Sequence, residues 1–223
     1  MNWNGLPVLI LGSGGISRET YNLIKQINMH NSQQVYDVLG FVENDASKIG
    51  KEVIRGLKVI TCDNALSDYS GLFSVVGIVI PIGNPKVKSI IYNRIKNIEN
   101  AVYPNIVHPS VEFDASDVQL GIGNIITAGV NLTCDIRIGN FNLINLNCTI
   151  GHDTVIEDFN VINPLVAVSG NVTINNCCLI GTGAKILQQI RINDSATVGS
   201  GAVVVKDVEE NSIVVGVPAK RIK

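Results

Sequence analysis

The stretch "INLNCTIGHDTV" (Ile144–Val155) carries isoleucines six residues apart, and the same spacing continues on both sides of it. Between Leu120 and Val204, every sixth residue is Leu, Ile or Val. The fifteen positions are Leu120, Ile126, Leu132, Ile138, Ile144, Ile150, Ile156, Ile162, Val168, Ile174, Ile180, Ile186, Ile192, Val198 and Val204. One period held over this length predicts a repeat architecture, because an ordinary β-sandwich would not keep a single spacing.

Other positions of each sextet are also restricted. Small or branched residues often stand two positions before the aliphatic residue, on the same face of a strand. They are Val130, Ile136, Cys148, Thr154, Val166, Val172, Cys178, Ala184, Ala196 and Ala202. Gly or Asn often follows it directly and is expected to supply the left-handed backbone of a corner. These residues are Gly121, Gly139, Asn145, Gly151, Asn163, Asn175, Gly181, Asn193 and Gly199. Each sextet therefore predicts a short strand and a corner, and the stack predicts a parallel β-helix with an interior aliphatic ladder.

The first hundred residues follow a different pattern, in which strands and helices alternate. Predicted strands cover Leu6–Gly12, Val35–Val42, Leu57–Ile60 and Phe73–Ile80, and predicted helices cover Ser17–His30, capped by Ser17, and Pro85–Ile98, with Pro85 in the first turn. This order predicts a small parallel sheet with helices on its faces. We expect two domains, a Rossmann-like α/β domain over residues 1–104 and a β-helix over residues 105–223.

Composition excludes several classes of protein. Seventeen Lys and Arg nearly balance nineteen Asp and Glu, so we expect no nucleic-acid or anionic-membrane partner. The apolar run Pro7–Leu11 is too short for a signal peptide or a membrane span, which predicts a cytoplasmic protein. The cysteines are odd in number and lack a CxxC pair, so we expect small buried side chains and no metal site. They are Cys62, Cys134, Cys148, Cys177 and Cys178.

His152 follows the ladder residue Ile150 by two positions, so we expect it at a corner with its side chain outside the coil. An exposed corner histidine is often a plain surface residue. It is also the natural general base near neutral pH, suited to taking a proton from an attacking amine or hydroxyl. Asp153 follows directly and offers a carboxylate that can fix the tautomer of the imidazole and raise its basicity.

A glycine loop, "GSGG" (Gly12–Gly15), stands between the first predicted strand and helix. Such a loop aims backbone N–H groups and a helix N-terminus at an anion, typically a phosphate. The dinucleotide pattern GxGxxG is incomplete, because Ser17 occupies the third glycine position. A plain tight turn is the alternative interpretation.

Two further loops follow predicted strands, where open parallel sheets bind their ligands. "FVEND" places Glu43 and Asn44 after the second strand, and "IGNP" places Gly83 after a later one. Both segments are candidates for substrate binding. The alternatives are a solvated turn for the first and a helix-start turn for the second.

The ordered motifs "LILGSGGISRE", "GFVEND", "IGNP", "NLNCTIGHD", "VSGNVTI", "IGTGAKI", "VGSGAVVVKDV" and "VVGVPAKRI" carry a resemblance that spans essentially the whole chain. The sextets resemble the hexapeptide-repeat acyltransferases. The full set resembles a subgroup of sugar acetyltransferases related to bacterial sialic acid O-acetyltransferases and to N-acetyltransferases of nucleotide-linked 4-amino sugars. The resemblance implies a left-handed β-helix, a homotrimer, and acetyl-CoA bound in the groove between neighbouring β-helices.

The resemblance also implies roles for individual residues. It makes His152 the general base, with Asp153 as its modulator. It assigns substrate binding to Gly12, Ser13, Gly14, Gly15, Glu43, Asn44, Gly83 and Asn145, and acetyl-CoA binding to Val161, Gly181, Thr182, Gly199, Ser200 and Lys220. The second acidic residue that is common after the second strand is replaced here by Asn44. Val161 stands where many relatives have a histidine or polar group near the thioester.

The resulting expectation is an acetyl-CoA-dependent N-acetyltransferase acting on a UDP- or dTDP-linked 4-amino-deoxy sugar for bacterial surface glycans, needing no metal. The nucleotide base is open between uracil, thymine and guanine. O-acetylation of a sialic acid is the first alternative, and a non-catalytic nucleotide-sugar-binding protein is the second. A zinc enzyme of the carbonic anhydrase type would need three histidines on the β-helix, but His152 is the only histidine after His108.

Overall fold

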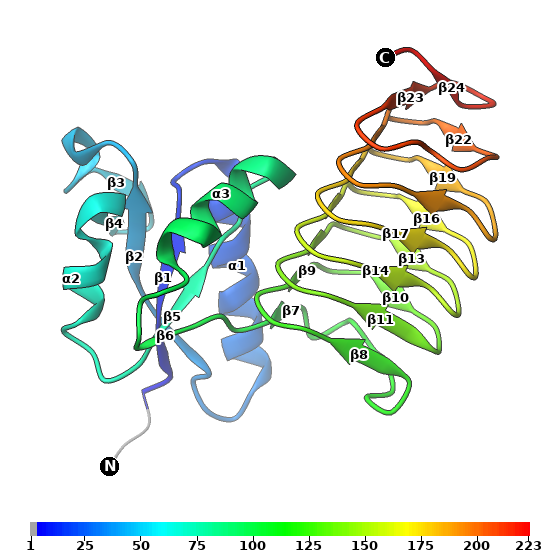
Figure 1. Ribbon diagram of the computed structural model, residues 1–223. Coiled ribbons are helices and arrows are strands. Elements are labelled where there is room, and N and C mark those ends of the chain that lie inside the picture. Colours follow the sequence, from blue (N-terminus) through cyan, green and yellow to red (C-terminus); the bar gives the residue numbers. More distant parts are fainter. Residues whose placement is uncertain (1–3) are drawn as a thin grey trace.

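The computed structural model describes residues 4–223. An α/β domain built on one sheet lies beside a tall β-helix, whose coils stack toward the C-terminus (Figure 1). The chain passes from the first part to the second between β6 (Ala101–Val102), which pairs with the α/β sheet, and β7 (Ile106–Val107), which pairs within the β-helix. Both expected architectures, the Rossmann-like domain and the parallel β-helix, are confirmed.

The α/β sheet has the strand order β3-β4-β2-β1-β5-β6. Its further elements are β1 (Leu6–Leu11), α1 (Gly15–His30), β2 (Tyr36–Glu43), η1 (Ala46–Lys48), β3 (Glu52–Ile54), β4 (Leu57–Cys62), η2 (Asp63–Ala65), α2 (Leu66–Ser70), β5 (Val76–Val79) and α3 (Pro85–Ile95). All pairings are parallel except that of the short edge strand β3 with β4. Helix α1 packs on one face of the sheet, and α2 and α3 pack on the other.

The predicted cap of the first helix is wrong. Helix α1 begins at Gly15 with Gly14 as its N-cap, and no side chain caps it. Ser17 is buried in the first turn, and its hydroxyl donates to the carbonyl of Leu11. The prediction for α3 is confirmed, since Pro85 stands in its first turn and Asn84 caps it by accepting from the N–H of Val87.

The β-helix is left-handed and consists of three parallel sheets with one hairpin at its C-terminal end. Its further strands are β8 (Val118–Leu120), β9 (Ile125–Ile126), β10 (Asn131–Leu132), β11 (Ile136–Ile138), β12 (Leu143–Ile144), β13 (Thr149–Ile150), β14 (Val155–Ile156), β15 (Val161–Ile162), β16 (Ala167–Val168), β17 (Thr173–Ile174), β18 (Leu179–Ile180), β19 (Lys185–Ile186), β20 (Arg191–Ile192), β21 (Thr197–Val198), β22 (Val203–Val204), β23 (Ile213–Val215) and β24 (Lys220–Arg221). Partners such as Ile144 and Ile162 differ by eighteen residues, so three sextets complete one coil.

The aliphatic ladder is buried as predicted. Fourteen of its fifteen side chains are at most 4% exposed, and Leu120, in the first strand of its sheet, packs partly buried against them. The residues two positions earlier are buried as well. In three sextets that position holds Asn124, Asn142 or Asn160, each at most 1% exposed. The side-chain oxygen of each of these asparagines accepts a backbone N–H from the next coil, so burial of the amides is compensated.

The predicted position of the corner conformation is wrong. From Leu120 to Val198, the left-handed residue is the third after each ladder residue, not the first. The glycines directly after the ladder residues instead allow the backbones of neighbouring coils to approach each other closely. A Cβ on Gly181 would lie 2.4 Å from the backbone nitrogen of Ser200 in the next coil. The third position accepts even Phe141 and Leu165, because the backbone bonds between coils impose the conformation.

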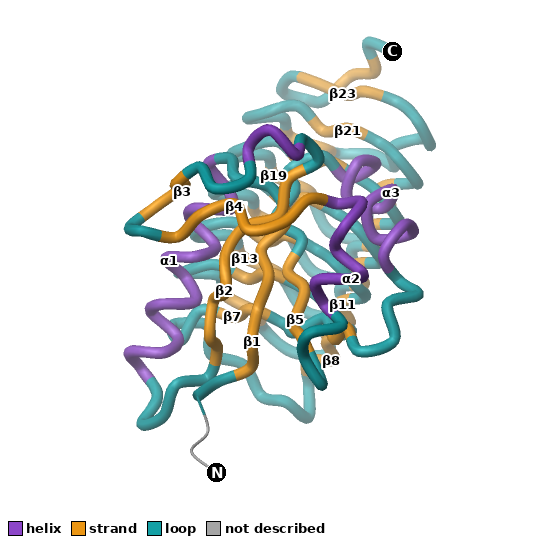
Figure 2. The backbone as a smooth tube through the Cα atoms, turned by 90° about the vertical axis from the view of Figure 1, so that its left-hand side faces the viewer, coloured by secondary structure: helices purple, strands orange, loops and turns teal. Residues whose placement is uncertain are grey.

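The two parts of the chain share a core. Helix α1 lies between the α/β sheet and the eight-stranded sheet of the β-helix, as the two orthogonal views show (Figures 1 and 2). Ile24 and Ile27 of α1 belong to one apolar cluster with Leu143 and Val161 of the β-helix. Helix α3 adds a second contact, in which the ring of Tyr92 packs 4.3 Å from that of Phe141, centroid to centroid.

Lys88 of α3 is buried at this second contact. It is 1% exposed, and its Nζ donates a 3.0 Å hydrogen bond to the backbone carbonyl of Phe141. Burial lowers the pKa of Lys88 from 10.5 to about 7, because the ammonium loses its hydration. The junction between the domains therefore contains a titrating group.

Stability is expected to rise with pH because of Lys88. Between pH 7 and pH 9 the unfolded chain keeps the proton on this side chain, whereas the folded protein releases it. The free energy of unfolding gains about 1.4 kcal/mol per pH unit from this group. Below pH 7 both states are protonated, so stability no longer changes with pH through this group, and the full cost of burying the ammonium remains.

Urea denaturation of the wild type and Lys88→Met at pH 7 and pH 9 measures the effect. The stability of the wild type relative to the variant should increase by about 2–3 kcal/mol over this interval. Lys86→Met, an exposed lysine of the same helix, is the matched control and should show no such change. A difference between wild type and Lys88→Met that is the same at both pH values would contradict the prediction.

Candidate active site

His152 lies in the turn between β13 and β14, and its side chain is 53% exposed. Its Nδ1 is 2.7 Å from Oδ2 of Asp153, whose side chain is 59% exposed. An ionised carboxylate only accepts hydrogen bonds, so Nδ1 carries the proton in this pair. In the neutral imidazole, Nε2 then holds the free lone pair, as a general base requires.

Neighbouring coils hold the backbone of this turn on both sides. The N–H of Asn171 in the following coil donates to the carbonyl of His152 at 2.7 Å, and the N–H of Asp153 donates to the carbonyl of Cys134 in the preceding coil at 3.2 Å. Asp153 is the left-handed residue of its corner, with φ 58°. The coil stack therefore orients both side chains of the pair.

Gly170 stands one coil above His152, and we did not predict a role for it. A Cβ at Gly170 would lie 2.4 Å from Nε2 and 2.5 Å from Cε1 of His152. The imidazole therefore occupies the space that any other residue would fill at this position. The signal was present in the sequence, because Gly170 follows His152 by the eighteen residues of one coil.

Most of the residues predicted to bind acetyl-CoA stack on a different edge of the β-helix. Gly181 and Gly199 each follow a strand of the eight-stranded sheet, as does Asn145, and the three positions differ by multiples of eighteen. Thr182 and Ser200 stand next to the two glycines. His152 lies on the following edge, one short strand further along the same coil as Asn145. Within one chain, the catalytic candidates and the acetyl-CoA candidates thus occupy neighbouring edges.

Two other acetyl-CoA candidates lie elsewhere. Val161 is 1% exposed and packs against the cluster that contains α1, so its side chain has no surface to offer a ligand. We therefore remove Val161 from the candidate set. Lys220 is exposed in the C-terminal hairpin formed by β23 and β24.

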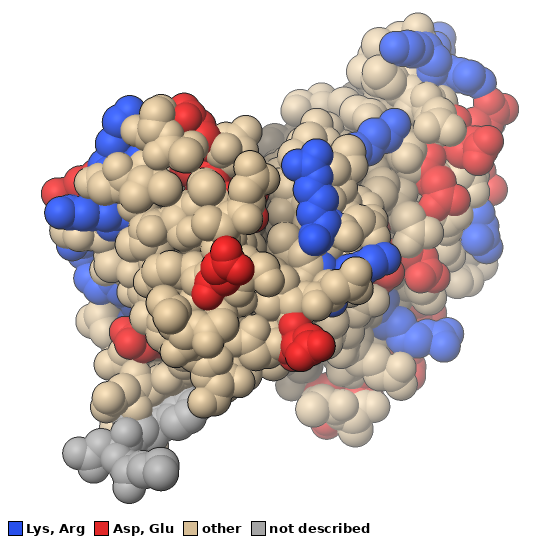
Figure 3. Space-filling view, turned by 60° about the vertical axis from the view of Figure 1, so that its left-hand side comes forward, with Lys and Arg blue, Asp and Glu red and all other residues tan. Residues whose placement is uncertain are grey.

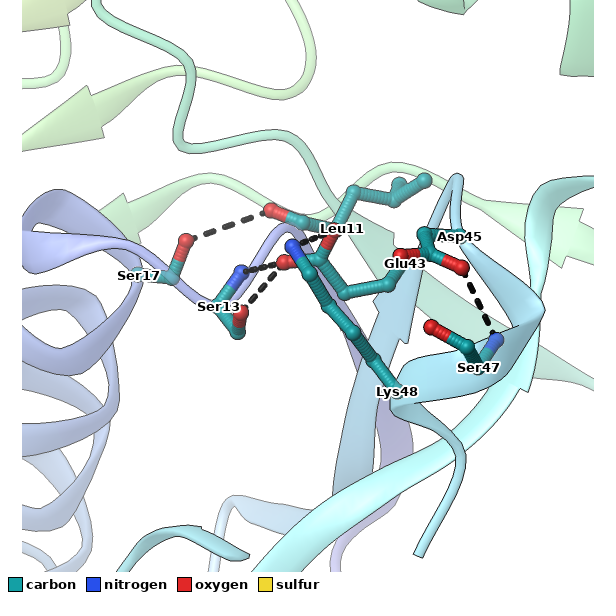
Figure 4. Close-up of polar contacts among 7 residues, drawn as sticks. All are labelled: Leu11, Ser13, Ser17, Glu43, Asp45, Ser47 and Lys48. Carbon is teal, nitrogen blue, oxygen red and sulfur yellow. Dashed lines mark hydrogen bonds and ion pairs between the residues drawn. The ribbon is translucent and has the colours of Figure 1, made fainter. Parts of the chain in front are cut away.

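The glycine loop lies at the carboxyl end of β1 and has open space before it. Nothing lies within 4 Å of a Cβ built on Gly14 or Gly15. Both the N–H and the hydroxyl of Ser13 donate to Oε1 of Glu43, and Lys48 binds Oε2 at 3.1 Å (Figure 4). The structure thus brings together two of the predicted substrate residues, Ser13 and Glu43.

The environment of Glu43 favours its ionised form. Burial raises the pKa of the carboxyl, but the hydrogen bonds from Ser13 and Lys48 and the charge of Lys48 outweigh burial, so its pKa lies below the usual value. Glu43 is therefore an anion that holds the loop from the side of β2. Gly83 has a packing role as well, since a Cβ there would lie 2.7 Å from Cδ1 of Ile16.

A cavity of about 410 Å³ opens beside the loop. Its lining includes Gly12, Glu43 and Asn44 from the predicted set, and also Asp63 and Arg94, which we did not predict. Asp63 begins η2 directly after β4, and Arg94 lies in the last turn of α3. The volume lies within the range of small-molecule sites.

The face drawn in Figure 3 shows no dominant charge. Basic and acidic side chains are intermixed on it. Within residues 4–223, no helix has the length and apolarity to cross a membrane. In the same range, no group of three or more His, Cys, Asp and Glu side chains is arranged to hold a metal ion.

The fold and the site together define a class. A small parallel-sheet domain with a cavity at its glycine loop is joined to a left-handed β-helix that presents a His–Asp pair. This is the architecture of the hexapeptide-repeat sugar acetyltransferases, so the resemblance of the sequence to that group is confirmed for the fold.

Comparisons with known proteins agree with this class. Residues 7–95 match the family model described as the PglD N-terminal domain, which is less than half of the chain. No curated protein matches the chain. Solved structures match it over almost its whole length, and at these sequence identities they establish the shared fold.

Three of these structures are from bacteria. PerB from Caulobacter crescentus, solved with CoA and GDP-perosamine, has TM-score 0.86 and 24% identity over 97% of both chains. The acetyltransferase domain of PglB from Neisseria gonorrhoeae, solved with acetyl coenzyme A, has TM-score 0.86 and 23% identity over 98% of this chain and 100% of its own. WeeI from Acinetobacter baumannii has TM-score 0.81 and 26% identity over 97% and 100%.

Proposed function

We propose that the protein is an acetyltransferase that moves the acetyl group of acetyl-CoA onto the amino group of a nucleotide-linked 4-amino-deoxy sugar. The observation that carries the proposal is the 2.7 Å His152–Asp153 pair, held by the coil stack on the outside of the β-helix. Such a pair suits proton removal from a weakly acidic nucleophile. Both co-substrates are cytoplasmic metabolites, which would place the reaction in the cytoplasm.

The proposed reaction is direct attack. Nε2 of His152 takes a proton from the sugar amine as its nitrogen attacks the thioester carbonyl, and a tetrahedral intermediate forms. The C–N bond forms in this attack. When the intermediate collapses, the C=O double bond re-forms and the C–S bond breaks, and His152 returns the proton to the departing thiolate. Asp153 keeps the Nδ1 proton in place and stabilises the imidazolium that forms in between.

We further propose that the protein acts as a homotrimer. Within one chain, His152 and the stacked Asn145, Gly181 and Gly199 lie on neighbouring edges of the β-helix. A groove between two copies would bring one copy's His152 toward the other copy's edge of small residues, where the pantetheine arm can lie. Thr182 and Ser200 would line that groove, and Lys220 would meet the nucleotide end of coenzyme A.

The cavity at the glycine loop supports a nucleotide-bearing acceptor. Its position at the carboxyl ends of β1, β2 and β4 is where parallel sheets bind nucleotides. PerB was crystallised with CoA and GDP-perosamine, a pair of ligands of the kind proposed here. A free sialic acid would leave this cavity unused, so O-acetylation of such a sugar is the less favoured alternative.

A thiol-release assay with acetyl-CoA tests the function. Acceptors are UDP-, dTDP- and GDP-linked 4-amino-4,6-dideoxy sugars, the matching 4-hydroxy sugars and a free sialic acid. We expect thiol release with at least one amino sugar and none with its 4-hydroxy counterpart, and mass spectrometry should find the N-acetyl product. Release with sialic acid but with no amino sugar would contradict the proposal.

A further inference from the structure

The cavity beside the glycine loop has apolar walls and two charged groups that the loop does not use. Its walls are formed by Leu11, Val42, Ile82, Val87, Ile90 and Ile91. Val87 and Ile90 are 43% and 52% exposed, which leaves apolar surface free for a planar ring. Asp63, which begins η2 directly after β4, and Arg94, in the last turn of α3, line the same cavity.

Both charged groups are available to a ligand. Among residues 4–223, neither the carboxylate of Asp63 nor the guanidinium of Arg94 has a hydrogen-bond or ion-pair partner. They are close enough to influence each other, since burial raises the pKa of Asp63 and the charge of Arg94 acts in the opposite direction. The cavity thus presents one hydrogen-bond acceptor, the carboxylate of Asp63, and one set of paired N–H donors, the guanidinium of Arg94.

Glu43 lines the same cavity but is already engaged. Its two oxygens are bound by Ser13 and Lys48, so it serves the loop in this structure (Figure 4). Recognition of a base by charged groups therefore falls to Asp63 and Arg94.

Guanine matches this pair of groups better than the other bases. Its N1–H and N2–H₂ are adjacent donors that a carboxylate accepts together, and its O6 and N7 are adjacent acceptors that fit the guanidinium fork. Uracil and thymine have one N–H between two carbonyl oxygens, and those oxygens would face the carboxylate unfavourably. We infer that the cavity binds guanine through Asp63 and Arg94, so that the acceptor is a GDP-linked sugar rather than the UDP- or dTDP-linked sugar expected from the sequence.

The inference rests on the proposed function only in taking the acceptor to be a nucleotide-linked sugar. Nucleotide-binding measurements test it without any need for catalysis. Isothermal titration of the full-length protein with GDP, UDP and dTDP, in the absence of acetyl-CoA, should show GDP binding at least about tenfold more tightly. Asp63→Asn and Arg94→Lys should each weaken GDP binding by about tenfold or more, because each breaks a bidentate contact. Binding of UDP should change less than threefold.

Asp68→Asn and Lys96→Ala, exposed substitutions on α2 and just after α3, are the controls and should leave GDP affinity unchanged. The inference is overturned if UDP or dTDP binds as tightly as GDP. It is also overturned if the two variants weaken all three nucleotides equally, since that would place the side chains at the ribose or phosphates. Failure of every acetyl-transfer assay with GDP preference intact would overturn only the proposed function.

Discussion

Replacing His152 with Ala is expected to lower kcat by about 10²–10⁴-fold while the fold stays intact, because a general base contributes an effect of that size. The side chain is more than half exposed, and its removal leaves the interior ladder untouched. The two backbone hydrogen bonds of the turn, from the N–H of Asn171 to the carbonyl of His152 and from the N–H of Asp153 to the carbonyl of Cys134, do not involve the imidazole. The loss should therefore appear in turnover and not in stability.

Single-turnover thiol release at saturating acetyl-CoA measures this effect, with thermal denaturation as the check on folding. His30→Ala is the matched control, because His30 is an exposed histidine at the end of α1, outside the candidate active site. Wild-type turnover in His152→Ala would remove the general base from the mechanism. Acetyl transfer would then need another group at the reacting amine.

Replacing Gly170 with Ala is expected to lower kcat by about a hundredfold, the second-largest effect. Ordinary contact of a Cβ begins near 3.4 Å, whereas the new methyl would lie 2.4 Å from Nε2 of His152, so the ring has to move by about 1 Å. Displacement of a catalytic group by that distance costs on the order of 10²-fold in rate. The φ of Gly170 lies outside the left-handed range, so Ala does not strain the backbone there.

The double variant His152→Ala/Gly170→Ala separates a positioning role from a general structural one. If Gly170 acts through the imidazole, the double variant is no slower than His152→Ala, because the space is then empty. The KM for acetyl-CoA should stay near the wild-type value in Gly170→Ala. A further loss of rate in the double variant, or a fall in melting temperature as large as the fall in activity, would contradict the positioning role.

Residues at the site differ in how far the sequence predicted them. His152 and Asp153 were predicted because the six-residue period fixes which side chains point outward from the coil. Imidazole is also the side chain best suited to act as a general base near neutral pH. Glu43 was predicted to bind the substrate, but its contact with Ser13 and Lys48 depends on how β2 lies against the loop. Asp63 follows a strand, and Arg94 lies in the last turn of a helix, thirty-one positions further along the chain, so no local pattern links them.

The amino-acid sequence by itself determined the two architectures, because periodic burial is a one-dimensional property: every sixth side chain from Leu120 to Val204 must avoid water. It also determined that His152 points outward. The tertiary structure decided which residues carry the strained corners, since coil-to-coil hydrogen bonds impose left-handed backbone at Phe141 and Leu165 despite their side chains. It alone decided that Lys88 is buried at the junction of the domains and that Gly170 makes room for the imidazole, because both depend on distances between segments that meet only after folding.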